Sequence, residues 1–348
     1  MDEKKPRRPR YKGTHPKTFK EKYKELQPEA YAADVEKVMQ QGRTPAGMHR
    51  SICINEIMDF LAIQTGQIGL DATLGYGGHS LEILKRLTPG GHLFATDVDP
   101  FELPRTKERL TALGFGDDVL TIRKMNFSGI DQLIYESGPL NFVLADLGVS
   151  SMQIDNPDRG FSFKVDGPLD LRLNPKSGKP ASAFLNDIGR NELEDLLVQN
   201  SDEPYANLIA TAIYTVISTG TRIETTKQLR EIIAQALPLL PAENIKEEIK
   251  KTCQRCFQAL RIAVNDEFGV LDKFLEKIPA ALAPGGRVAI LSFHSGEDRR
   301  VKKSFQHFLR EGIYNEVSPE FIRATAEEIN SNPRARSAKL RWAVKQAE

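Results

Sequence analysis

One segment, residues 68–80, constrains the fold of this chain more than any other. A short apolar run ends in Asp71, a loop with Gly75, Gly77 and Gly78 follows, and leucines then recur at helical spacing. Strand, glycine-rich turn and helix in this order form the nucleotide-binding corner of a doubly wound α/β sheet. Glycine is needed because the backbone must bend sharply and let a ligand approach where a Cβ would clash. The segment therefore predicts an α/β fold with a ligand site at the strand's carboxyl end.

The charge of Asp71 narrows the choice of ligand. Its carboxylate would repel a pyrophosphate, and the loop does not follow the Gly-x-Gly-x-x-Gly spacing. S-adenosyl-L-methionine carries a sulfonium, an ammonium and a carboxylate, so an acid at the strand end and free N–H groups at the helix start suit it. Asp97 ends the next apolar run, where an acceptor for ribose hydroxyls is expected. These residues favour S-adenosyl-L-methionine and leave another nucleotide or a purely structural turn as alternatives.

Two later strands also carry polar residues at their ends. Residues 119–122 lead to Asn126 and Phe127, a position that often flanks a bound adenine, although Phe127 fits a core position equally well. Residues 141–146 end in a third acid, Asp146. Ligands bind outside the carboxyl ends of parallel strands, so three acids at one sheet edge indicate a ligand crevice.

Charge and cysteine content exclude several classes of protein. The chain has 348 residues and a net charge of +1, but its first 24 residues hold ten Lys or Arg and three acids. This basic start is either a phosphate contact or a solvated tail. Three cysteines do not form a disulfide framework, and Cys253 and Cys256 fit half-buried thiols on a helix better than a metal or redox pair. With no apolar run of about 18 residues and no signal core, we expect a cytoplasmic protein without a membrane span.

The periodicity changes along the chain and predicts an insertion. Residues 180–251 carry only helical spacing, which indicates a subdomain of three or four helices, and 257–278 form a further helix that returns to the core. A fifth strand at 287–292 leads to a polar loop, and residues 340–344 alternate as an edge strand does. The expected domains are a basic extension at 1–48, a main domain at 49–151 and 255–348, and a helical insertion at 152–254.

Seven segments match one known family in order from about residue 49 to the C-terminus. They are residues 71–80, 146–151, 159–163, 167–170, 257–265, 292–299 and 332–341. Together they resemble the bacterial ribosomal RNA small-subunit methyltransferase H family, also called MraW. The chain departs from the family's usual pattern at Leu173, where Met is usual, at Gly296, where Leu is usual, and in its longer basic start.

The resemblance implies a class I, Rossmann-like S-adenosyl-L-methionine-dependent methyltransferase sheet, interrupted after its fourth strand by a helical substrate-recognition domain. It implies N4-methylation of a cytosine in the decoding centre of 16S small-subunit ribosomal RNA, within an assembled or nearly assembled 30S subunit. It does not decide whether the protein is a monomer or a homodimer. The cofactor contacts carried over by motif are Gly77, Gly78, His79, Asp97, Phe127, Asp146 and Gln153.

The chemistry of this reaction suggests roles for the remaining candidates. The lone pair of cytosine N4 is conjugated into the ring, so an acceptor for its hydrogen stabilises the charge that develops during methyl transfer. Asp146 is the first choice, or else only orients the cofactor. His294 could accept the proton or hold a phosphate, or be structural, and Ser150 could bond the base edge or cap a loop.

Three arginines are candidates for RNA phosphates, and we expect no metal. They are Arg159, Arg261 and Arg336, although Arg261 could instead pair with Glu267 or Asp272. A nicotinamide oxidoreductase would need the third glycine of the Gly-x-Gly-x-x-Gly pattern and a hydride-relay pair, and the sequence shows neither. A non-catalytic ribosome-assembly factor with the same fold, or a methyltransferase for another RNA nucleotide, is the remaining alternative.

Overall fold

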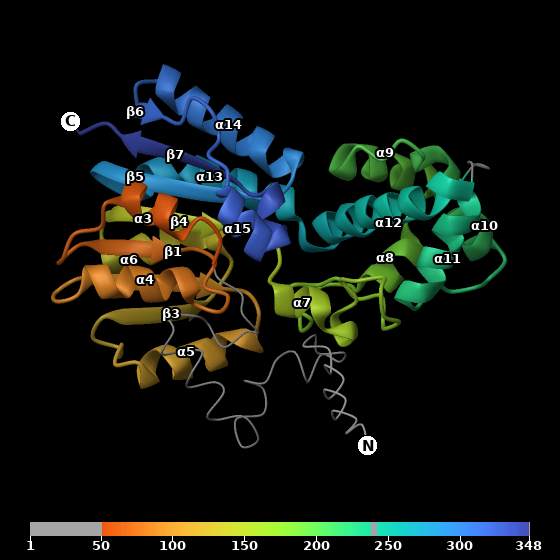
Figure 1. Cartoon of the computed structure of the whole chain (residues 1–348), viewed down its shortest axis with the longest axis horizontal. Helices are drawn as coiled ribbons and strands as arrows, with labels where there is room; N and C mark the ends of the chain where they lie inside the picture. The colour runs from red at the N-terminus through yellow and green to blue at the C-terminus, as the bar shows by residue number, and fades with distance from the viewer. Residues whose placement is uncertain (1–50, 238–241, 348) are drawn as a thin grey trace, which may run out of the picture. The chain divides into compact units, whose positions relative to one another are not determined.

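The computed structural model describes residues 51–237 and 242–347 (Figure 1), so the predicted basic extension lies outside the described residues. Within them, one sheet has the strand order β3-β2-β1-β4-β5-β7-β6. The strands are β1 (Ile68–Asp71), β2 (His92–Asp97), β3 (Leu120–Lys124), β4 (Leu140–Asp146), β5 (Leu282–Ser292), β6 (Tyr314–Val317) and β7 (Lys339–Lys345). This sheet confirms the α/β fold class that the glycine loop predicted.

The parallel part of the sheet determines where a ligand can bind. Strand β1 pairs in parallel with β2 on one side and with β4 on the other, so the strand order reverses at β1. In open α/β sheets, ligands bind at such a switch point, beyond the carboxyl ends of the strands. Asp71, Asp97 and Asp146 therefore end neighbouring strands at this edge.

One strand was missed and another was misplaced by the sequence prediction. Residues 340–344 belong to β7, which pairs antiparallel with both β5 and β6 and is therefore not the edge strand. The edge strand on this side of the sheet is β6, which has only 4 residues and two exposed polar positions. Such a short segment carries too little apolar alternation for its sequence to predict a strand.

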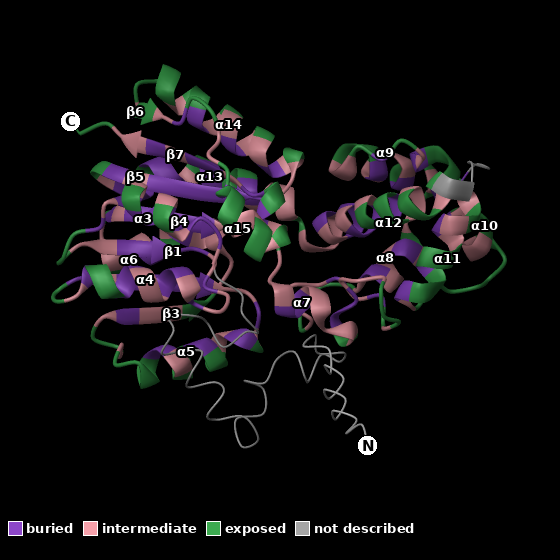
Figure 2. Ribbon diagram, viewed as in Figure 1, coloured by how far each residue is buried: buried purple, intermediate pink, exposed green. Residues whose placement is uncertain are grey.

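Helices cover both faces of the sheet, which explains the nearly continuous apolar runs in its central strands. Phe142 and Leu144 of β4 face one core, and Val143 and Ala145 face the other. Figure 2 shows these central strands as mostly buried. The first core is shared with α3 (Ile54–Leu61), α4 (Gly78–Leu87) and α5 (Glu102–Ala112), the second with α6 (Ile130–Ser137), α13 (Glu267–Ala281) and α14 (Ser295–Arg310).

The predicted helical insertion has a buried core of its own, to which Cys253 and Cys256 belong. The prediction of one helix over 257–278 is wrong, because the chain turns at Asp266, whose φ is 49°. The preceding helix also runs unbroken through residue 254, so we propose Asn265 as the end of the insertion. Its helices are α8 (Ala181–Asp187), α9 (Arg190–Ser201), α10 (Ala206–Ser218), α11 (Thr226–Ala236) and α12 (Ala242–Asn265). None of the helices that the structure describes is long and apolar enough to cross a membrane.

Candidate active site

Asp71 organises the glycine loop from inside the protein. Its Oδ2 accepts a hydrogen bond of 2.6 Å from the Ser80 hydroxyl, and its Oδ1 accepts one of 3.1 Å from the Thr73 amide. Burial raises the pKa of this carboxyl. Asp71 was predicted to contact the cofactor, but it is only 1% exposed, and its oxygens bind the loop and the first turn of α4. It therefore shapes the loop that would receive the ligand.

The loop is held by β2 and α5. The Gly75 amide donates to Asp97 Oδ2 at 2.8 Å, and the Thr106 hydroxyl donates to the Gly75 carbonyl at 2.7 Å. Gly77 has a φ of 71°, and a Cβ there would lie 2.9 Å from the Thr106 methyl group, so glycine is required. Helix α4 begins at Gly78. The N–H groups of its first turn have no partner within the helix and can receive an anionic group.

Asp97 lies at the end of β2 and keeps acceptor capacity for a ligand. Its Oδ2 accepts from Gly75 as described, and its Oδ1 accepts from the Asp99 amide at 2.9 Å. Burial raises the pKa of the Asp97 carboxyl to about 6, despite these two backbone hydrogen bonds. Each carboxylate oxygen has a second lone pair, so Asp97 can still accept hydrogen bonds from hydroxyl groups.

Asp146 at the end of β4 has the most unusual environment of the three acids. Its Oδ1 is buried and has no hydrogen-bond partner among residues 51–237 and 242–347. Its Oδ2 lies 3.6 Å from Nδ1 of His79, which is itself buried. Burial raises the pKa of the Asp146 carboxyl to about 6, with His79 opposing the shift and the negative charges of Asp71 and Glu297 adding to it.

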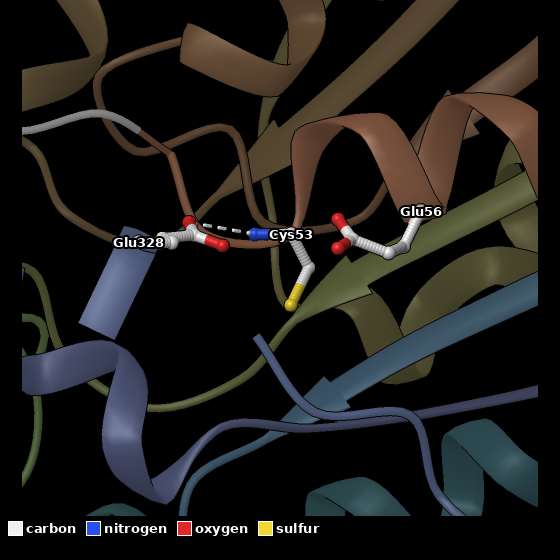
Figure 3. Close-up of side chains that lie close together, drawn as sticks. All are labelled: Cys53, Glu56 and Glu328. Carbon is white, nitrogen blue, oxygen red and sulfur yellow. Dashed lines mark hydrogen bonds between the residues drawn. The ribbon is translucent and has the colours of Figure 1, made fainter. Parts of the chain in front are cut away.

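The other nitrogen of His79 is fixed by the segment that precedes α3. Nε2 lies 3.0 Å from the carbonyl oxygen of Ile52. The next residue, Cys53, donates its amide hydrogen to Glu328 at 3.0 Å, and Figure 3 shows Glu328 reaching it from α15 (Ala326–Ser331). The side chains of Cys53, Glu56 and Glu328 are close enough to surround a cation. Burial and the two carboxylates raise the pKa of the Cys53 thiol to about 12. Because Glu328 binds the Cys53 amide, we assign the cluster a structural role in holding Ile52.

Asp99 is a central residue of this edge that the sequence analysis missed. It is buried, and its Oδ2 accepts from Gln153 Nε2 at 2.8 Å and from Arg159 Nη1 at 2.8 Å. Arg159 was predicted to contact RNA phosphate, but its side chain is only 9% exposed, so it offers almost no surface to a phosphate. It instead joins β2 to the start of the insertion. Asp99 lies two residues after Asp97, the acid that ends β2. This position just beyond a strand end is the sequence feature that could have identified it as a site residue.

Ser150 and Gln153 cap a short helix, α7 (Ser151–Asp155). The Ser150 hydroxyl accepts from the Gln153 amide at 3.2 Å, and the Gln153 side chain accepts from the Ser150 amide at 2.8 Å. This is a capping box, the non-catalytic role that was weighed for Ser150. Gln153 is thus held between α7 and Asp99 beside the predicted cofactor site. Nothing in the geometry brings the Ser150 hydroxyl to Asp146.

His294 and Arg261 belong to a second polar cluster, at the end of β5. His294 Nε2 lies 3.2 Å from Glu297 Oε1, and Arg261 makes a bidentate pair with Glu267 at 2.7 and 2.9 Å. Despite the cost of burial, the contact with His294, the charge of Arg261 and the backbone hydrogen bond from Phe293 lower the pKa of the Glu297 carboxyl. Arg261 therefore takes the alternative role, an ion pair with Glu267. Asn265 was also missed as a link, and its amide group bonds to the backbone of Leu171 and Leu173.

Two predicted residues remain at the margins of the site. Phe127 is half-buried and packs against Phe274 with ring centroids 4.9 Å apart, as a core residue would. Arg336 is exposed, three residues before β7, whose first residue, Lys339, pairs with Ser292 at the end of β5. Among the described residues Arg336 has no ion-pair partner, so it is the predicted arginine that is free for a phosphate.

The parallel strands β1, β2 and β4 each end in an acid, and a glycine loop leads into α4. At the far side of the sheet, β7 lies between β5 and β6. Together these features define a class I S-adenosyl-L-methionine-dependent methyltransferase. The chain belongs to the MraW methylase family, whose profile matches residues 46–346. It is 67% identical over 344 residues to "Ribosomal RNA small subunit methyltransferase H 2" of Alkaliphilus metalliredigens, covering 99% of both chains. It is 63% identical to "Ribosomal RNA small subunit methyltransferase H 1" of Lachnoclostridium phytofermentans, covering 97% of this chain and 93% of that protein.

Proposed function

We propose that this protein transfers the methyl group of S-adenosyl-L-methionine to N4 of a cytosine in the decoding centre of small-subunit ribosomal RNA. One observation supports an amine as the methyl acceptor, namely the buried Asp146 Oδ1, which lacks a donor within residues 51–237 and 242–347. A buried acceptor without a partner is costly unless a ligand supplies the donor. An amine hydrogen of cytosine fits this need, and the names of the relatives supply the RNA.

The residues present fit the cofactor. The N–H groups at the start of α4, from Gly78 on, can bind its carboxylate, and Asp97 can accept its ribose hydroxyls. When bound, S-adenosyl-L-methionine supplies a methyl group on a positively charged sulfur. The chain needs no covalent intermediate. Its task is to orient the amine and stabilise the charge that develops on it, and the Asp146 carboxylate is suited to both.

Replacing Asp97 with Ala is expected to weaken cofactor binding by roughly 1–3 kcal/mol, because the ribose hydroxyls and the Gly75 amide lose their acceptor. Calorimetric titration with S-adenosyl-L-methionine measures the change. Asp117→Ala is the matched control. The Asp117 side chain is 80% exposed and precedes β3, away from the carboxyl ends of the strands. Equal dissociation constants for Asp97→Ala and the wild type would remove Asp97 from the cofactor site.

The proposed reaction is tested with small subunits from cells that lack this gene. Incubation with the protein and labelled S-adenosyl-L-methionine, followed by nucleoside mass spectrometry, should yield N4-methylcytidine at one decoding-centre position. A different methylated nucleoside would contradict the assignment of the target. Subunit binding without methyl transfer would instead indicate a non-catalytic assembly factor.

The context of the reaction is part of the same proposal. We infer that the substrate is an assembled or nearly assembled 30S subunit in the cytoplasm, because N4 must be presented by an unpaired or flipped base in a defined place. Parallel reactions with naked RNA and with 30S subunits test this, and light scattering distinguishes a monomer from a homodimer. Equal rates on naked RNA would contradict the requirement for an assembled subunit.

Arg336→Ala is expected to weaken binding of the subunit several-fold and to reduce the dependence of the affinity on salt by about one phosphate contact. The reason is the exposed position of Arg336 near the carboxyl edge of the sheet. Lys85→Ala is a suitable control, because Lys85 lies near the C-terminal end of α4, at the opposite edge of the sheet. Salt titrations of both variants should separate them, and superimposable curves would exclude a phosphate contact at Arg336.

A further inference from the structure

We propose that His79 and Asp146 form one proton-holding pair, in which the His79 side chain is a positioning residue that keeps Asp146 ready to accept a proton. The proposal deepens the proposed function and rests on it, because the proton comes from the amine that is methylated. The family resemblance implied only that His79 contacts the cofactor. Its backbone amide in the first turn of α4 can do so, whereas its side chain is engaged elsewhere.

The first argument is the tautomer of His79. Nε2 lies 3.0 Å from the Ile52 carbonyl, which can only accept a hydrogen bond, so Nε2 carries the hydrogen. A neutral imidazole has one N–H, and Nδ1 therefore presents a lone pair to Asp146 Oδ2 at 3.6 Å. Two lone-pair sites then face each other with no hydrogen between them. The pair thus has room for one proton.

The second argument is the rigidity of this arrangement. The Asp146 amide donates to the Thr73 hydroxyl at 2.6 Å, which fixes the end of β4 to the glycine loop. Ile52 is fixed through Cys53, whose amide is held by Glu328 of α15. His79 is only 5% exposed. His79 is therefore held with Nδ1 facing Asp146, while the Asp146 side chain, which is 28% exposed, keeps a route by which a proton can leave to solvent.

The third argument is the charge around Asp146. Asp71 of β1 and Glu297 of α14 both bring negative charge toward it, while Glu297 is itself paired with His294. Of the groups that act on Asp146 in the described part of the chain, His79 is the basic one. A proton on Nδ1 would therefore stabilise the carboxylate against its acidic neighbours. Without His79, a proton accepted from the amine would have to stay on the Asp146 carboxyl, among these acidic neighbours.

The proton balance of the reaction follows from this geometry. The bond between N4 and the methyl carbon forms while the carbon–sulfur bond breaks, and its electron pair stays on sulfur. N4 then loses one hydrogen as a proton, which Asp146 Oδ1 accepts. The pair of Asp146 and His79 changes from a net charge of −1 to zero, with the proton residing on the carboxyl or on Nδ1. It returns to its starting state when the product leaves and the proton passes to solvent.

The test compares His79→Gln with His79→Asn in single-turnover methylation of 30S subunits at saturating cofactor between pH 5.5 and 8.5. Gln can place an amide N–H near the position of Nε2 and keep the bond to Ile52, but it has no nitrogen that can take a proton beside Asp146. Asn reaches only the position of Nδ1 and loses the bond to Ile52. Cofactor affinity by calorimetry and melting temperature are recorded for both variants.

The wild-type rate should fall as the pH drops, because the deprotonated pair is the active form and the pKa of Asp146 is raised to about 6. In His79→Gln this loss should occur at lower pH, because the variant keeps the Asp146 carboxyl but has lost the imidazole as a second site for the proton. Near pH 8, where the pair is deprotonated in both proteins, the rate should be about tenfold below that of the wild type, with cofactor affinity within about twofold. A His79→Gln profile that superimposes on that of the wild type would overturn the proposal.

A second measurement does not depend on catalysis. Long-range ¹H–¹⁵N spectra of the full-length protein should show His79 protonated on Nε2, with its Nδ1 resonance altered in Asp146→Asn. Protonation on Nδ1 alone, or an Nδ1 resonance that is unchanged in Asp146→Asn, would overturn the proposed pairing of His79 with Asp146. If the spectra agree but wild-type protein makes no N4-methylcytidine, the proposed function fails while the pair stands.

Discussion

Asp146→Asn should lower the single-turnover rate of methylation about 100-fold or more. The amide keeps the shape of the side chain but replaces a charged acceptor with a neutral one. Its NH₂ group could also point toward the substrate amine, where two donors would oppose each other. The effect should be this large because Oδ1 is buried and has no other partner in the described residues that could take over.

Cofactor affinity should change far less in the same variant. The interaction with Asp146 strengthens as the amine becomes cationic, so its loss affects the transition state more than the bound ground state. Calorimetry with S-adenosyl-L-methionine and single-turnover assays at saturating cofactor separate the two effects. Asp158→Asn, an exposed acid in the short helix after α7, is the control and should keep the wild-type rate.

The opposite pattern would reassign the residue. If Asp146→Asn loses cofactor affinity but keeps its rate at saturation, Asp146 is a cofactor-binding residue. His294 would be the next candidate for proton acceptor. It lies beside Glu297 at the end of β5, and both its ring nitrogens are buried without a well-aligned hydrogen bond in the described residues.

The strand ends of the site could be predicted because they depend on local sequence. Each of β1, β2 and β4 is an apolar run that stops at an acid, and a parallel sheet brings such ends to one edge. The positive φ of Gly77 is equally local, since it follows from the tight turn before α4, whereas the close approach of Thr106 comes from α5. Neighbouring residues alone therefore predicted which elements build the site.

The partners of the charged side chains could not be predicted, because they are distant in sequence. Arg159 reaches Asp99 across 60 positions. An arginine in a polar loop has the same local pattern whether it binds a phosphate or a buried acid. Arg261 shows the same ambiguity at short range, since Glu267 lies six positions away beyond the turn at Asp266. That turn has a left-handed residue that is not glycine, so the sequence carries no strong signal for it.

The buried pair of Arg159 and Asp99 also links the two parts of the chain. Besides Asp99, the Arg159 guanidinium donates to the carbonyls of Arg172 and Leu173 at 3.0 and 2.9 Å. The Leu173 amide in turn donates to Asn265 at 2.7 Å, at the end of α12. The strand that carries Asp97 is thereby connected to both ends of the insertion. The position of the insertion beside the cofactor edge should depend on this connection.

Arg159→Ala should therefore lower the free energy of unfolding by about 3–5 kcal/mol, the usual loss when one partner of a buried ion pair is removed. Asp99 would keep the hydrogen bonds from Gln153 and the Phe101 amide, but its charge would be buried without a cation. Urea titration measures the loss. Arg123→Ala is the matched control, because Arg123 and Glu136 form a pair that is 50% and 55% exposed and should contribute at most about 1 kcal/mol.

Arg159→Lys distinguishes the lost charge from the lost connection. Lysine restores a cation beside Asp99 but cannot donate to three acceptors in the fixed directions of a guanidinium. It should recover part of the stability, while amide hydrogen exchange in residues 167–173 should remain faster than in the wild type because the Arg172 and Leu173 carbonyls have lost their donor. If Arg159→Lys restores both the stability and the exchange protection, charge alone holds the insertion to β2. If even Arg159→Ala leaves both unchanged, the link between the insertion and the cofactor edge must run through Asn265 instead.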